Sequence, residues 1–65
     1  MKRYKVFEVI DLLEKDGWYL NRHNSTSHRQ FKNPSKKGTV TVNGKRSITL
    51  SQMVLNNIWK QAGWR

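Results

Sequence analysis

The sequence is informative first in what it lacks. It contains no cysteine, which excludes disulfides, thiolate nucleophiles and zinc sites built on sulfur. No apolar run approaches the roughly 18 residues needed to cross a bilayer, and the first residues lack the apolar stretch and cleavage site of a signal peptide. We therefore expect a cytoplasmic protein without membrane contact, whose 65 residues form one domain, 1–65.

Carboxylates are scarce and confined to one end of the chain. The four acids are Glu8, Asp11, Glu14 and Asp16. A two-metal nuclease needs carboxylates that converge from different segments, and a glycosidase needs a facing pair. Four acids on one predicted helix are more typical of a solvated helix face. The sequence therefore predicts no metal ion and no other cofactor.

The positive charge has the opposite distribution. The first 16 residues hold four Lys or Arg, which balance the four acids, so the net charge of +9 lies in residues 17–65. Such a distribution favours a polyanion, because neutralising phosphates releases condensed counterions. We expect nucleic acid as the partner, and an acidic protein is the alternative.

Hydrophobic periodicity predicts the element order α, β, β, β, α. Apolar residues at helical spacing indicate a helix over about residues 4–16, which Gly17 ends. A second helix is expected to begin after Ser51 as N-cap, with Leu55, Ile58, Trp59 and Ala62 in its apolar stripe, and to end at Gly63. We predict an α+β fold with two helices on one face of a three-stranded antiparallel sheet.

The three strands are expected over residues 18–23, from residue 28 onward, and over residues 39–42. Alternation places Trp18, Leu20 and Arg22 on one face of the first strand. If Phe31 faces the core, His28 lies on the opposite, solvated face of the second strand. The segment "NPSKKG" between the second and third strands is predicted to be a turn that Gly38 closes.

His28 is the best candidate for chemistry. Arg22, Arg29 and Lys32 lie near it in the sequence, and positive neighbours disfavour the imidazolium form. A neutral imidazole could remove the proton from a ribose 2′-hydroxyl, so RNA could be cleaved without metal while Lys or Arg stabilises the phosphate charge. A lone surface histidine is more often only a polar residue. His23 is a weaker candidate, because a presumed turn separates it from His28.

Other functional patterns have equally plain alternatives. Ser25 and Ser27 lie close to the histidines, but no acid is available to orient a serine hydrolase triad. Trp18 and Trp59 occupy positions that favour core packing over base stacking. Trp64 is open to either interpretation.

Several short motifs occur together in one order. They are "EKDGWYLNR", "SHRQFKNPSKKGTVTV" and the terminal "IWKQAG". In these motifs and their spacing the chain resembles the HicA toxins of bacterial and phage toxin-antitoxin pairs over nearly its whole length. It differs from the family pattern at Thr26 and Arg29, where the family usually has glycine and a second histidine.

The resemblance implies a fold like the double-stranded-RNA-binding domain, cleavage of mRNA without the ribosome, and a HicB-type antitoxin partner. It also implies that His28 is catalytic. We expect the toxin alone to be monomeric, and we predict that phosphates are bound by Arg22, Ser27, Arg29, Lys32, Lys36, Lys37, Lys45 and Arg46. A non-catalytic RNA-binding module and a basic protein-interaction domain remain the alternatives.

Overall fold

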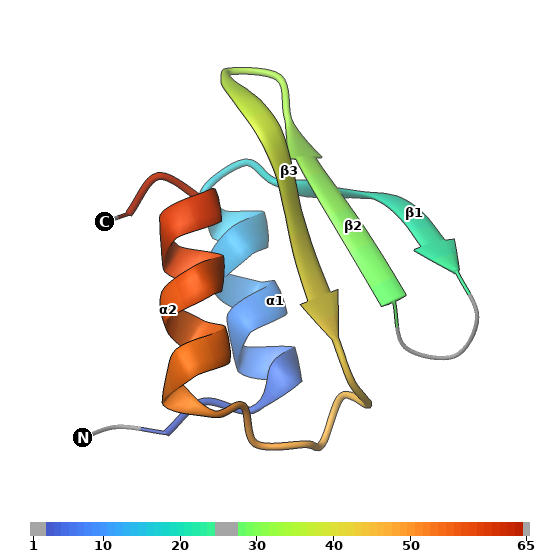
Figure 1. Cartoon of the computed structure of the whole chain (residues 1–65). Helices are drawn as coiled ribbons and strands as arrows, with labels where there is room; N and C mark the ends of the chain where they lie inside the picture. The colour runs from blue at the N-terminus through green and yellow to red at the C-terminus, as the bar shows by residue number, and fades with distance from the viewer. Residues whose placement is uncertain (1–2, 25–27, 65) are drawn as a thin grey trace.

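The computed structural model describes residues 3–24 and 28–64. It confirms the α+β fold and the predicted element order, with two helices side by side against one face of the sheet (Figure 1). The sheet is antiparallel with strand order β1-β2-β3. Within the described residues, no helix is long and apolar enough to cross a membrane. The elements are α1 (Val6–Lys15), β1 (Tyr19–Asn24), β2 (His28–Asn33), β3 (Lys36–Asn43) and α2 (Gln52–Gln61).

Helix α1 begins two residues later than the sequence predicts. Lys5 has extended backbone as the N-cap, and its N–H donates to Glu8 Oε1 at 2.9 Å. The segment before the helix instead pairs with the chain that leads into α2: Lys5 forms an isolated antiparallel bridge with Thr49, and the N–H of Leu50 donates to the carbonyl of Tyr4. This pairing between distant segments overrides the local helical pattern.

The end of α1 follows the prediction. Asp16 is the C-cap, and Gly17 has φ of +96°, a conformation that residues with a Cβ seldom adopt. The side chain of Trp18 is then buried beneath the sheet, and its backbone N–H donates to the carbonyl of Leu13. The sharp reversal at Gly17 thus directs the chain from helix to edge strand.

Strand β1 departs from simple alternation at a β-bulge. Leu20 is opposite Phe31, but Arg22 is opposite Gln30, so the register shifts between Leu20 and Arg22. The prediction that Leu20 and Arg22 share a face is therefore wrong. Leu20 lies in the row of buried Phe31, yet it is 47% exposed because β1 is the edge strand farthest from the helices (Figure 1).

The turn between β2 and β3 is tighter than predicted. Pro34 and Ser35 form it, and the Asn33 side chain stabilises it by accepting the N–H of Ser35 at 2.8 Å. Strand β3 therefore begins at Lys36, and Gly38 lies inside the strand with φ of +89° instead of closing the turn.

Helix α2 and the core match the sequence pattern. The Ser51 hydroxyl accepts the N–H of Val54, as an N-cap does. Trp59 is only partly buried and packs against the core cluster from its margin. The buried apolar side chains come from both helices, β2, β3 and the segments that flank them: Val6, Val9, Leu13, Trp18, Phe31, Val40, Val42, Leu50, Leu55, Ile58 and Ala62.

Candidate nucleic-acid interface

The side of the sheet that faces away from the helices is called the open face here. Cross-strand partners point to the same side of a sheet, so the register assigns its members. Phe31 and Val40 define the covered side, and the residues that alternate with them define the other. The open face carries Tyr19, Arg22, His28, Gln30, Lys32, Thr41 and Asn43.

His28 is the first residue of β2 and lies on the open face. Its Cα partners are Asn24 on β1 and Asn43 on β3. The side chain is exposed, and the alternating burial of β2 places Arg29 and Phe31 on the other side. The sequence-based prediction for the orientation of His28 is thus confirmed.

The bulge in β1 brings Arg22 to the same face as His28. Arg22 lies opposite Gln30, which is one same-face position, about 7 Å, along β2 from His28. Lys32 follows at the next same-face position and is exposed. The imidazole of His28 and the cations of Arg22 and Lys32 therefore share one surface. The alternation of β2 alone places His28 and Lys32 there, whereas Arg22 depends on the bulge.

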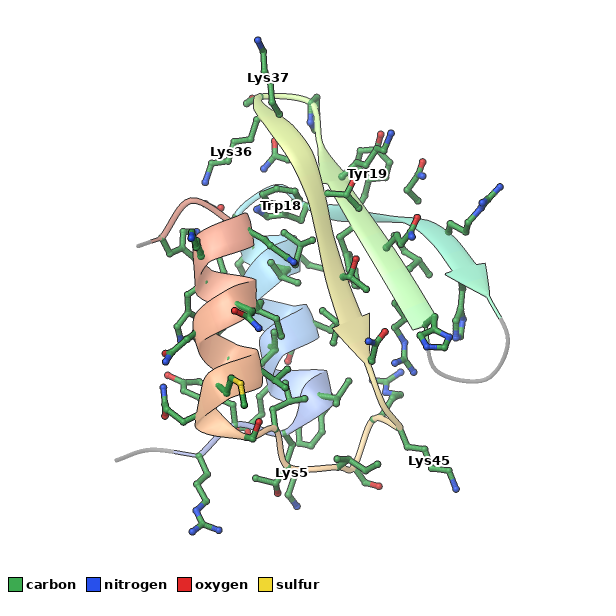
Figure 2. The ribbon with its side chains drawn as sticks, in the orientation of Figure 1. Lys5, Trp18, Tyr19, Lys36, Lys37 and Lys45 are labelled. Atoms are coloured by element: carbon green, nitrogen blue, oxygen red, sulfur yellow. The ribbon has the colours of Figure 1, made fainter. Side chains whose placement is uncertain are left out.

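The loop after β3 supplies further cations close to the end of the sheet that holds His28. Lys45 and Arg46 are exposed and follow Asn43, the Cα partner of His28. The loop is anchored to the first turn of α1, because Phe7 N–H donates to the Arg46 carbonyl at 3.1 Å. Figure 2 shows Lys45 projecting from this end of β3.

Arg29 is placed differently from the other predicted phosphate ligands. Its side chain lies on the covered side, only 9% exposed, and Nη1 donates to the Gly44 carbonyl at 2.7 Å. Val42 is its Cα partner. The guanidinium therefore fixes the start of the Lys45–Arg46 loop and is not presented on the open face.

The side chains of the two lysines of the β2–β3 hairpin, Lys36 and Lys37, point in different directions. Lys37 projects from the hairpin tip, at the end of the sheet opposite Lys45 (Figure 2). Lys36 turns back toward the helices, where Nζ forms an ion pair with Asp16 Oδ2 at 2.9 Å and donates to the Ala62 carbonyl at 3.1 Å. Only Lys37 is free of these internal contacts. Ser27 lies outside the described residues.

Asp16 has a role that the sequence pattern did not reveal. We predicted a solvated helix face, but Oδ2 accepts hydrogen bonds from Lys36 Nζ and from the indole N–H groups of Trp18 and Trp64, at 2.9, 3.1 and 3.0 Å. The Lys36 hydrogen bond, followed by that of Trp64, lowers the pKa of Asp16 below its usual value. A buried indole usually finds an acceptor, so Trp18 beside Asp16 was the available signal.

Tyr19 is a candidate binding residue that the sequence reasoning missed. It is exposed on the open face, opposite Lys32. An exposed ring beside a cation can stack on an unpaired base while the cation contacts phosphate. The signal was the neighbouring pair Trp18 and Tyr19, since alternation makes only one of them a core residue. Trp18 is that core residue, as the packing interpretation predicted.

The arrangement suits a polyanion better than a metal ion. Among residues 3–24 and 28–64, no three His, Asp or Glu side chains come together in a way that could hold a metal. The open face carries cations, a histidine, an aromatic ring and neutral polar side chains, with no carboxylate among its residues. Such a surface attracts phosphate, and its histidine can act as a proton acceptor for a hydroxyl beside that phosphate.

The fold and this face define a small basic α+β domain with a histidine on an exposed antiparallel sheet. Residues 7–64 match the family model described as "HicA toxin of bacterial toxin-antitoxin", and the chain belongs to this family. Membership supports a toxin role, with an antitoxin as its partner. Comparison with curated proteins found no match.

Proposed function

We propose that this HicA-family protein is a metal-independent endoribonuclease that cleaves mRNA, with His28 as its general base. His28 removes the proton of a ribose 2′-hydroxyl, and that oxygen attacks the adjacent phosphorus. The bond to the 5′-oxygen breaks as that oxygen takes a proton from water, which leaves a 2′,3′-cyclic phosphate and a 5′-hydroxyl. The family assignment supports the toxin role, and the RNA chemistry is the proposal.

The observation that carries the proposal is the exposed His28 on a face shared with Arg22 and Lys32. Negative charge develops on the phosphate oxygens during attack, and nearby cations stabilise it. A metal-dependent nuclease would instead need converging carboxylates, which the open face lacks.

The proposed substrate is single-stranded or looped RNA. Tyr19 offers a ring for stacking, and Lys32, Lys37 and Lys45 offer contacts to the phosphates along and at both ends of the sheet. Helix α2 carries only one basic residue, Lys60, so a duplex-binding helix is less well supported. Since mRNA is the proposed substrate, the cytoplasm is the compartment we expect.

The proposed inhibitor is a HicB-type antitoxin that covers the open face. A segment placed over His28 would block access of the 2′-hydroxyl and would compete with RNA for Arg22 and Lys32 at the same time. An acidic segment suits this surface, because its neighbours on the sheet are cationic.

The chain offers a matched control for the catalytic role. His23 is the other histidine; it is exposed, but its Cα partner is Arg29, so it belongs to the opposite side of the sheet. We expect His28→Ala to abolish cleavage and toxicity, with at least a hundredfold loss of rate as is common for a general base, on the order of 10²–10⁴. RNA affinity and thermal stability should remain close to those of the parent protein.

His23→Ala should retain cleavage within a fewfold of the parent protein. The measurement is the rate of cleavage of a labelled RNA by each purified variant, with affinity measured separately by fluorescence anisotropy. Equal activity of His28→Ala and the parent would reject His28 as the base. RNA binding without cleavage by the parent protein would favour a non-catalytic RNA-binding module.

A further inference from the structure

A second surface lies on the helical side of the molecule, away from the open face. A shallow hollow of about 390 Å³ is lined by Tyr4, Leu12, Trp59 and Trp64. It is formed where α1 and α2 lie side by side, with residues just before α1 and just after α2 at its margins. Three of its four lining side chains are aromatic, and the proposed RNA chemistry uses none of them.

The rings of this hollow are held in fixed relative orientations. Tyr4 and Trp59 meet edge to face, with centroids 5.5 Å apart and an interplanar angle of 83°. Trp59 and Trp64 lie 5.2 Å apart and are tilted by 37°. Trp64 is fixed twice, through its backbone N–H to the Trp59 carbonyl at 2.8 Å and through its indole N–H to Asp16. The site is therefore organised before any ligand arrives.

Carboxylates adjoin the aromatic hollow. A neighbouring hollow of about 220 Å³ shares Tyr4 and Leu12 with it and is otherwise lined by Glu8, Asp11 and Lys15. Two acids and one base give this margin a net negative charge. Residues 17–65 contain no carboxylate side chain, so among the described surfaces this margin favours a cation more than the sheet or the β2–β3 hairpin does.

Ring faces and adjacent carboxylates together match a guanidinium group. Its plane stacks on indole and phenol rings, and its N–H groups can pair with a carboxylate. We propose that this hollow docks an arginine-bearing, otherwise apolar segment of a protein partner. The apolar flanks of that segment would contact Leu12 and the ring edges, and the arginine would lie between the rings and Asp11.

Charge decides between this occupant and the alternatives. RNA phosphates would meet Glu8 and Asp11 and be repelled. A second copy of this chain is less suitable, because the basic residues mapped above lie on the sheet, at the hairpin tip and in the loop after β3, so copies would have to associate head to tail. The proposal is independent of RNA cleavage and would hold if His28 had no catalytic role.

The test uses the full chain and a short peptide probe. A blocked Ala-Leu-Arg-Leu-Ala peptide is titrated into ¹⁵N-labelled protein, and the indole N–H resonances of Trp59 and Trp64 are followed by NMR. The matched probe replaces the arginine with citrulline, which keeps the shape and removes the charge. We expect both resonances to shift with the arginine peptide, and the citrulline peptide to bind about three- to fivefold more weakly.

Two variants with the same charge change separate a site from general attraction. Asp11→Lys alters the margin of the hollow, whereas Glu14→Lys alters an exposed residue of the same helix that lines neither hollow. Asp11→Lys should weaken binding of the arginine peptide about fivefold or more, and Glu14→Lys should leave it within twofold. Both variants should keep the parent circular dichroism spectrum and RNA-cleaving behaviour.

Four results of the peptide, variant and RNA titrations would overturn the proposal. They are unmoved indole resonances, equal binding of the citrulline peptide, equal losses in the two lysine variants, and shifts of the same resonances caused by a short RNA oligonucleotide. Concentration-dependent shifts of these resonances without peptide would likewise replace the proposed partner with a second copy of the chain.

Discussion

At the scale of single residues, the structure reassigns charged side chains that the sequence treats alike. Asp16 accepts three hydrogen bonds that connect the end of α1, the start of β3 and the residues after α2. Arg29 supports a loop from the covered side of the sheet. Asp16 is exposed, as Asp11 is, and Arg29 lies on the same strand as exposed Lys32, so neither position along the chain nor exposure alone marks the structural charges. Partners far along the chain decide which charges are structural, and local patterns do not contain that information.

The Asp16 site predicts a stability difference that depends on pH. The pKa of Asp16 is lowered in the folded state, so the folded protein binds this proton less readily than the unfolded chain does. Its contribution is complete above the unfolded pKa, near 3.9, and is lost as pH falls through the lower folded pKa. Asp16→Asn should therefore lower the melting temperature at pH 6 and have a much smaller effect near pH 2.

Asp11→Asn makes the same change in net charge without touching these hydrogen bonds. Thermal unfolding of the parent and both variants across this pH range gives the comparison. A melting temperature for Asp16→Asn that equals that of Asp11→Asn at pH 6 would contradict the structural role of Asp16.

Arg29 and Lys32 should differ in their effect on RNA binding. Lys32 is exposed on the open face, so Lys32→Met should remove one phosphate contact and reduce the slope of log affinity against log salt by about 0.7. Arg29→Met should leave this slope unchanged, because Arg29 is only 9% exposed and its guanidinium donates to the Gly44 carbonyl. Fluorescence anisotropy with a single-stranded oligonucleotide at several salt concentrations measures both. A reduced slope for Arg29→Met would show that the Arg29 guanidinium contacts an RNA phosphate and would contradict its structural role.

At the scale of elements, the sequence predicted each helix and strand but not their irregularities. Periodicity, Gly17 and Ser51 were sufficient for element type and order. The bulge between Leu20 and Arg22 arises from pairing with β2, and it moves Arg22 to the open face. Likewise, alternation places Leu20 of the first strand on the same face as Trp18, but the position of this strand at the edge of the sheet leaves Leu20 exposed. The orientation of His28 was predictable because β2 alternates without interruption through Phe31.

The two glycines that follow the helices allow an element-scale prediction. Gly17 and Gly63 both have positive φ, +96° and +79°. A Cβ on Gly17 would lie 3.3 Å from Asn33 Nδ2, whereas a Cβ on Gly63 would meet nothing within 4 Å. Gly63→Ala should lower the free energy of unfolding by about 1 kcal/mol through backbone strain alone.

Gly17→Ala should cost more than Gly63→Ala, because it also displaces the Asn33 amide that donates to the Asp16 carbonyl. Urea unfolding with a common m-value measures the difference. Equal losses for the two variants would show that the Asn33 contact contributes little.

At the scale of the whole molecule, the two layers separate two kinds of surface. Three of the four acids lie on α1 and Asp16 caps its end, and the aromatic hollow lies on the helical side, while the open face carries His28 among cations. The sequence predicted this partition, since the acids end at Asp16. It did not predict that Lys36 and Arg29 are engaged internally, so the positive surface available to RNA is smaller than the net charge indicates.

The proposed function requires one exposed imidazole, that of His28, to cleave RNA without a metal ion. The most direct measurement is incubation of the purified protein with a labelled RNA in excess EDTA, followed by analysis of the new termini. We expect undiminished cleavage, with 2′,3′-cyclic phosphate and 5′-hydroxyl ends that are absent when His28→Ala is used. Cleavage that EDTA abolishes, or products with 5′-phosphate ends, would contradict it.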